Sequence, residues 1–333
     1  MTGPVTFYKT NDLIQGLRVL QELGQGAAST VYLAQDPKTK QIWAVKHVHR
    51  ESEKDDRFLD QAVAEYEVAS KLSHPHIRRI EKIFKERQKL IVLTDVYLVM
   101  ELVDGTSLEK RPRITLEQAV DIFHQTASAI QHMHDRGFVH ADMKPNNIMI
   151  VRPCNVKIID LGQTCPTNTV KKRIQGTPDY IAPEQAQLKP ITPQTDVFNL
   201  GATMYWVLTG RTIHTMMNQG DGLTDKRDPG FLPKTTPVSQ IDPRIHPKLN
   251  DLVMQCVEND PAARPQTAQE VADRLQLVLG MLRAKVPATA GKPLAPSDSQ
   301  LILQIAAGSS GDRESATGST DVTGARVVPG PKR

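Results

Sequence analysis

The pattern of hydrophobic and polar residues changes twice along the chain, near residue 104 and again after residue 286. Over residues 17–103 short runs alternate, as at Val31 and Leu33 or in the segment 43–45, a pattern typical of half-buried strands. Residues 56–72 instead repeat their apolar side chains every three or four positions, which predicts a helix with one apolar face. The first part of the chain therefore predicts a small sheet with one packed helix.

Helical periodicity dominates the second part, over residues 106–282. Thr115 and Gln118 stand three positions apart before an apolar repeat, which predicts a capping box at the start of a helix. Residues 196–208 are apolar nearly all round, so we expect a helix buried at the centre of this part.

A third composition begins after Val286. Residues 286–333 contain no aromatic side chain and are dense in Pro, Gly, Ser, Thr and Ala, so they cannot bury enough surface to offset the entropy of ordering. We expect a disordered tail with one apolar piece at residues 301–305. Its candidate autophosphorylation sites are Ser309, Ser310, Ser315, Thr317 and Thr320.

Charge and cysteine content narrow the range of partners and compartments. The net charge of +4 is spread over 41 basic and 37 acidic residues, which favours neither a nucleic-acid nor a membrane partner. The three cysteines have no CxxC spacing and fit a reducing compartment without disulfides. There is no leader-like N-terminus and no apolar run near the roughly 18 residues that a membrane span needs. We expect a soluble, cytoplasmic protein.

One stretch has the spacing that phosphoryl transfer requires. Residues 140–147 read His-Ala-Asp-Met-Lys-Pro-Asn-Asn, and Asp-Leu-Gly follows at residues 160–162. Asp142 is placed as the base near an acceptor hydroxyl, while Asn147 and Asp160 are placed to hold magnesium ions that bridge ATP phosphates. A polar turn would explain the Asp, Asn and Pro residues but not their spacing.

Other segments occur around this stretch in a fixed order. A glycine-rich segment covers residues 24–31, Trp-Ala-Val-Lys ends at Lys46, Gly-Thr-Pro-Asp-Tyr-Ile-Ala-Pro-Glu ends at Glu184, and Arg264 comes late in the chain. Together they resemble a serine/threonine protein kinase of the eukaryotic-like kind found in bacteria, from about residue 16 to about residue 282. A GxxxxGK[ST] motif is absent, so a P-loop enzyme is not expected.

The resemblance implies an α+β, bilobal protein-kinase fold. It places an N-lobe of five antiparallel strands and one helix at about residues 16–103, a hinge near residues 101–103, and a mainly helical C-lobe at about residues 104–285. Residues 1–15 would be an N-terminal extension. The implied reaction is transfer of the ATP γ-phosphate to Ser or Thr of protein substrates, with self-association for autophosphorylation.

The resemblance also assigns roles to the catalytic residues. Lys46 would pair with a helix glutamate; Glu65 and Glu67 point to different faces, and Glu65 lies on the inward side. Lys144 would steady the transferring phosphate, and Thr177 would bond near Asp142. The residues expected around ATP are Leu23, Gly24, Gly26, Val31, Ala44, Lys46, Met100, Glu101, Val103, Met149 and Asp160.

Structural roles follow from the same resemblance. Glu184 and Arg264 would form a partly buried ion pair, and Asp196 would cap the backbone of the catalytic loop. His132 and His134 diverge by ~200° around a helix, so they cannot share a metal, and we expect His140 to be a buried support.

Two departures from the family pattern affect regulation. Ala141 replaces the arginine that usually reads an activation-loop phosphate, so activity should not depend strongly on phosphorylation of Thr164, Thr167 or Thr169. Leu161 replaces the usual Phe after the metal aspartate and can still pack as an apolar residue.

Two alternatives to a protein kinase stay open. A pseudokinase would use the fold for scaffolding or ATP binding without turnover, although the sequence keeps Lys46, Glu65, Asp142, Asn147 and Asp160. A small-molecule phosphotransferase is disfavoured by Lys144 and the Ala-Pro-Glu segment.

Overall fold

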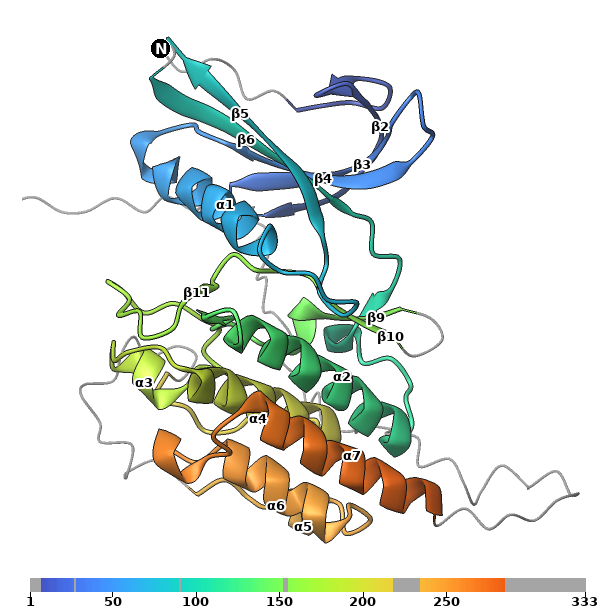
Figure 1. Ribbon diagram of the computed structural model, residues 1–333, viewed down its shortest axis with the longest axis vertical. Helices are drawn as coiled ribbons and strands as arrows, with labels where there is room; N and C mark the ends of the chain where they lie inside the picture. The colour runs from blue at the N-terminus through green and yellow to red at the C-terminus, as the bar shows by residue number, and fades with distance from the viewer. Residues whose placement is uncertain (1–6, 27, 90, 152–154, 218–233, 285–333) are drawn as a thin grey trace, which may run out of the picture.

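The computed structural model describes residues 7–26, 28–89, 91–151, 155–217 and 234–284. The tail predicted over residues 286–333, including residues 301–305 and the candidate phosphorylation sites, lies outside the described residues, as does Cys154. Figure 1 shows two lobes, with the large sheet and α1 in one and the helices α2, α4, α6 and α7 in the other. The predicted bilobal α+β fold is confirmed by this arrangement.

The smaller lobe is built on an antiparallel sheet. Among the described residues it has six strands in the order β1-β2-β3-β4-β6-β5. The strands are β1 (Leu13–Ile14), β2 (Leu17–Gly26), β3 (Ser29–Gln35), β4 (Ile42–His49), β5 (Ile80–Gln88) and β6 (Val92–Glu101). The predicted helix is α1 (Asp56–Ala69), preceded by η1 (Glu53–Asp55), and it packs on one face of the sheet (Figure 1).

The sheet contains one strand more than the five we predicted. Leu13 and Ile14 pair with Arg18 and Leu17 of β2, and the Ile14 side chain is fully buried. The prediction missed this strand because two residues are too few to show an alternating pattern. The sheet therefore begins inside the segment that we had interpreted as an N-terminal extension.

Short strands connect the two lobes and position the catalytic segments. The small sheets contain β7 (Thr106–Ser107), β8 (Phe138–Val139), β9 (Ile148–Val151), β10 (Asn155–Ile158) and β11 (Cys165–Pro166). The predicted hairpin between Asn147 and Asp160 is the antiparallel pair β9 and β10, which lies between the large sheet and α2 (Figure 1).

The larger lobe is mainly helical. Its helices are α2 (Leu116–His134), α3 (Pro183–Ala186), α4 (Pro193–Thr209), α5 (Val238–Ile241), α6 (Pro247–Cys256) and α7 (Ala268–Ala284), with the short turns η2 (Leu108–Lys110), η3 (Pro145–Asn147) and η5 (Pro261–Ala263). Thr115 and Gln118 form the predicted capping box, since each side chain accepts a hydrogen bond from the other residue's amide.

Helix α4 is the centre of this lobe. Every residue from 195 to 209 is buried, as its all-round apolar pattern predicted. Gly201 lets α6 approach closely, because a Cβ at this position would lie 2.5 Å from the Cβ of Cys256. Such a contact is shorter than packed side chains allow, so α4 and α6 require glycine here.

Candidate active site

The catalytic loop, residues 140–147, is held by the N-terminal part of α4. One carboxylate oxygen of Asp196 accepts a hydrogen bond from the His140 amide at 2.8 Å, and the other accepts one from the Ala141 amide at 2.7 Å. Ala141 has a φ of 61°. An L-residue pays about 1–2 kcal/mol in this left-handed region, so the Asp196 bonds and the Gln185 side chain, which donates to the Ala141 carbonyl at 2.8 Å, must hold it.

Asp142 lies at the tip of this supported turn and is 9 % exposed. One of its carboxylate oxygens accepts a hydrogen bond from the Thr177 hydroxyl at 3.1 Å, and the other lies 2.9 Å from the Lys144 ammonium. Lys144 also donates to the Thr177 hydroxyl at 2.7 Å. Thr177 therefore bonds to Asp142, as the family resemblance implied, and all three residues are in mutual contact.

The same loop fixes the side chain of Asn147 by a hydrogen bond. Its side-chain nitrogen donates to the Asp142 carbonyl at 2.9 Å, which directs the amide oxygen away from that bond. The Ile159 amide donates to the Asn147 carbonyl at 3.1 Å, so the start of the Asp160 segment is tied to the end of the catalytic loop. The hairpin β9–β10 thus brings the two predicted metal ligands to one place.

Asp160 is surrounded by groups that favour its charged form. Burial would raise its pKa, but the Lys46 ammonium, the Gly162 amide at 2.9 Å and the more distant His140 and Arg78 together hold the pKa below its ordinary value. The carboxylate is therefore ionised at neutral pH, as a metal ligand must be.

Lys46 pairs with Glu65 and not with Glu67. The Lys46 ammonium lies 2.8 Å from a carboxylate oxygen of Glu65, whose side chain is fully buried, whereas Glu67 is exposed on the other side of α1. Burial alone would lower the pKa of Lys46, but Glu65 and Asp160 raise it above its ordinary value. Lys46 therefore carries a positive charge next to Asp160.

Apart from Asp160, the residues predicted around ATP come from five strands, β2, β3, β4, β6 and β9, and from the segment just after β6. In the sheet register Ala44 lies opposite Met100, and Val31 lies opposite both Gly24 and Lys46. Ala44 and Met100 are buried, whereas Leu23 is 45 % exposed at the edge. The remaining predicted contacts are Gly26 on β2, Glu101 on β6, Val103 just after β6 and Met149 on β9.

This arrangement of segments matches a known family. Residues 17–275 fit the model described as protein kinase domain, which covers more than half of the chain. The chain belongs to the protein kinase family. Serine/threonine-protein kinase PknA of Mycobacterium tuberculosis is 30% identical over 325 residues, with 94% of this chain and 73% of PknA covered.

Other relatives of this kinase are longer than the chain. PrkC of Bacillus subtilis, named a serine/threonine-protein kinase, is 28% identical over 263 residues, which cover 76% of this chain and 39% of PrkC. The match to a Clostridium acetobutylicum relative, named a probable serine/threonine-protein kinase, also spans only 39% of that protein. The predicted resemblance to eukaryotic-like kinases of bacteria is confirmed by these relatives.

The fold comparison agrees with the family. The crystal structure of the Mycobacterium tuberculosis PknI kinase domain (C20A_R136A double mutant) superposes with a TM-score of 0.63 at 22% identity, covering 83% of this chain and all of that domain. At this identity the likeness concerns the fold alone. Within the described residues of this kinase, no helix has both the length and the hydrophobicity to cross a bilayer.

A buried ion pair links two distant parts of the kinase's larger lobe. Arg264, 2 % exposed, donates to both carboxylate oxygens of Glu184, at 2.8 and 3.0 Å. Its remaining donors reach the carbonyls of Glu258, Gln194 and Asn259, and its guanidinium lies 4.8 Å from the ring centroid of Phe198. The predicted ion pair is present; it is bidentate and more deeply buried than expected.

Several residues around the site carry no recognisable signal in the sequence. A guanidinium nitrogen of Arg78 lies 3.9 Å from the second carboxylate oxygen of Glu65. Burial lowers the pKa of Arg78. The His134 ring is 2.8 Å from Asp196, so it supports the residue that caps the catalytic loop. A charged residue directly after the buried Ile77 was the only signal for Arg78, and such a position is more often exposed.

Proposed function

We propose that this kinase transfers the γ-phosphate of ATP to serine and threonine hydroxyls of protein substrates. The observation that carries the proposal is the contact of Asp142 with both Lys144 and Thr177, in a loop whose Asn147 is fixed by the Asp142 carbonyl. A carboxylate, an ammonium and a hydroxyl within hydrogen-bond distance of each other would supply a base and a positive charge to one reacting centre, which supports the proposal.

The residues fit a nucleotide with a divalent metal. Members of the family use ATP, and we propose Mg²⁺ as the metal because Asp160 and the Asn147 amide offer the hard oxygen ligands that it prefers. The depressed pKa of Asp160 supports this assignment. When bound, Mg²⁺ neutralises charge on the phosphate oxygens as the phosphoryl group is transferred.

The chain's own residues supply positioning and electrostatic stabilisation. Asp142 would orient the acceptor hydroxyl and take its proton, while the Lys144 ammonium would stabilise negative charge next to it. Lys46, held by Glu65, would bind phosphate oxygens from the sheet side. The Lys144–Thr177 contact of 2.7 Å supports serine and threonine as acceptors, because in the family resemblance this arrangement is typical of serine/threonine rather than tyrosine kinases.

The test is phosphate transfer from γ-labelled ATP to the protein itself and to a generic basic protein, followed by phosphoamino-acid analysis. We expect label on Ser and Thr, with Mg²⁺ present, and none after the metal is chelated. Label on Tyr alone, or turnover only with a small alcohol, would overturn the assignment of substrate class.

The pseudokinase alternative has no support from the relatives, whose names describe them as kinases. The close Lys46–Glu65 pair and the ionised Asp160 also argue against it, because a scaffold needs neither. We also propose that the kinase domain spans about residues 16–285, that its substrates are proteins, and that two copies of the chain associate during autophosphorylation. A cytoplasmic location stays a prediction from composition.

Activity should not depend on phosphorylation of the segment after Asp160. The backbone at residue 141 is held by neutral and anionic protein groups, and Ala141 offers no cation to a phosphate. Replacing both Thr167 and Thr169 by Ala should therefore change kcat less than about threefold, which corresponds to under ~1 kcal/mol. Steady-state transfer to the basic protein measures this, and a near-complete loss of activity would contradict it.

Removing the Lys46 charge should weaken catalysis strongly. Because Lys46 is the partner of buried Glu65 and neighbours Asp160, Lys46→Met should lower kcat/KM by about 10²–10³, as for other lost electrostatic contacts in active sites. Lys82→Met, an exposed lysine on β5, is the matched control and should leave kcat/KM unchanged. Equal effects of the two substitutions would argue against a role for Lys46.

A further inference from the structure

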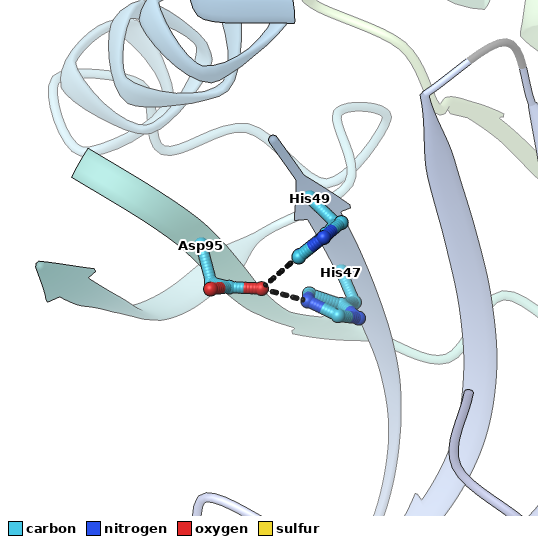
Figure 2. A group of neighbouring side chains, drawn as sticks. All are labelled: His47, His49 and Asp95. Carbon is cyan, nitrogen blue, oxygen red and sulfur yellow. Dashed lines mark hydrogen bonds and ion pairs between the residues drawn. The ribbon is translucent and has the colours of Figure 1, made fainter. Parts of the chain in front are cut away.

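A second group of chemically active side chains lies in the smaller lobe, on β4 and β6, away from the catalytic residues. His47 and His49 stand two positions apart on β4, so both point to the same face of the sheet, opposite to the face of Lys46. Asp95 lies directly across from His49 in the register of β4 and β6. Figure 2 shows both imidazole rings turned toward the Asp95 carboxylate.

The three side chains converge on one point. The same Asp95 oxygen lies 2.7 Å from His47 Nε2 and 2.7 Å from His49 Nδ1. Each residue offers one atom that can bind a metal, and these three atoms lie within 4.8 Å of one another. Tetrahedral ligands at the usual bond lengths to zinc, about 2.0–2.2 Å, are roughly 3.3–3.5 Å apart, so a metal requires only a small opening of the present contacts.

The surroundings fix the His47 ring. The His47 ring stacks on Tyr97, with centroids 4.5 Å apart and an interplanar angle of 8°, and Tyr8 packs edge-on at 5.6 Å. The hydroxyls of Tyr8 and Tyr97 are 3.0 Å apart, which ties these two rings to each other. A ring that is held in place in this way loses little freedom when it binds a metal.

The cluster also has access and a favourable charge. A cavity of about 170 Å³ is lined by both histidines and by Glu51 and Asp55, whose carboxylates favour the approach of a cation. His49 Nε2 is buried and has no hydrogen-bond partner in the part of the chain that the structure describes. Room for water beside the histidines leaves a fourth ligand position open.

We propose that His47, His49 and Asp95 bind a divalent transition-metal ion of the zinc class. Two imidazoles and one carboxylate are a common protein ligand set for Zn²⁺, whereas Mg²⁺ prefers oxygen ligands alone. The metal takes the place of the two ring protons that now point at one oxygen of Asp95, so each imidazole carries its proton on its other nitrogen, and the metal bridges β4 to β6 on the outer face of the sheet. The site is separate from the pair Asn147 and Asp160.

A second histidine group in this kinase provides the control. The ring of His74 lies 5.0 Å from that of His132 and 5.3 Å from that of His76. Here the nitrogens are used by the backbone, since His74 Nδ1 accepts from the His76 amide and His132 Nε2 accepts from the Ser73 amide. This group contains no carboxylate, so His132→Asn should leave metal binding unchanged.

The experiment uses the full chain without an affinity tag, stripped with a chelator and kept in excess Mg²⁺ so that the oxygen-ligand site is filled. Zn²⁺ is titrated against a chromophoric chelator, and Co²⁺ is added separately to record its visible absorption bands. We expect one tight Zn²⁺ per chain. His49→Asn and Asp95→Asn should each weaken it at least about tenfold and abolish the Co²⁺ bands, because removing a ligand costs no less than losing a residue that supports one.

Asp95→Asn keeps the size of the side chain and still accepts a hydrogen bond. If His49→Asn does not fold, the result for Asp95→Asn decides whether these residues bind Zn²⁺. A thermal midpoint that rises with Zn²⁺ in the parent chain and in His132→Asn, but not in Asp95→Asn, supports the site. Zn²⁺ binding of equal affinity in the parent chain and Asp95→Asn, or no Zn²⁺ binding at all, overturns it.

Discussion

Replacing Asp142 by Asn is expected to lower kcat for transfer to Ser or Thr by about 10²–10⁴, the usual contribution of a positioned general base. Asparagine has nearly the same shape and can still accept a hydrogen bond from Thr177, so the loop should keep its geometry. It cannot take a proton, and it removes the negative charge that now faces Lys144 at 2.9 Å. ATP affinity should change little, because Asp142 is not among the predicted nucleotide contacts.

The control for this substitution is Asp135→Asn. Asp135 is exposed after the end of α2 and accepts a hydrogen bond from the Gln131 side chain, so its loss should leave kcat unchanged. Steady-state kinetics with the basic protein, together with a nucleotide-binding titration, measure both effects. A fall in ATP affinity with unchanged kcat would indicate that Asp142 binds the nucleotide instead of activating the acceptor.

Replacing Arg264 by Met is expected to destabilise the kinase by about 3–5 kcal/mol, the usual loss when one partner of a buried pair is removed. The change leaves the Glu184 carboxylate buried at 5 % exposure, with the Thr195 hydroxyl at 2.9 Å as a remaining partner. It also leaves the carbonyls of Glu258 and Asn259 without this donor. The thermal midpoint should fall by roughly 6–20 °C for a chain of this size.

Burial, more than distance, is the reason for this large effect. Arg283 contacts Glu117 at 2.8 Å, the same distance as the Arg264–Glu184 pair, but both side chains are largely exposed. Arg283→Met should therefore barely change the midpoint. Adding Glu184→Gln to Arg264→Met should recover part of the loss, because the second change removes the unpaired charge. Equal shifts for the two single arginine variants would contradict this account.

Local patterns predicted the fold well where an element is long or has a strong end signal. The capping box at Thr115, the buried α4 and the hairpin β9–β10 follow from neighbours in sequence. The choice of Glu65 over Glu67 came from the family resemblance together with helical spacing, and the contact of Glu65 with Lys46 fits that prediction. The two-residue strand β1 was missed because its burial depends on a partner strand and not on its own pattern.

Contacts between distant strands and loops could not be predicted from local sequence patterns. Arg78 lies in the segment between α1 and β5 and meets Glu65 only in the folded lobe, and Gln185 reaches the Ala141 carbonyl across 44 positions. His47 and His49 share a sheet face by their spacing, but Asp95 joins them only through the register of β4 with β6. Register is set by packing of the whole sheet, so no local motif marks the resulting cluster.

The most direct test of the central claim is a single-turnover experiment with the kinase in excess over γ-labelled ATP and Mg²⁺. Under these conditions each bound nucleotide is followed once, so slow catalysis is not confused with none. We expect label to move from ATP to serine or threonine hydroxyls in the parent chain and to stay in ATP in Asp142→Asn. Label that remains in bound ATP in the parent chain would contradict this expectation and favour a pseudokinase.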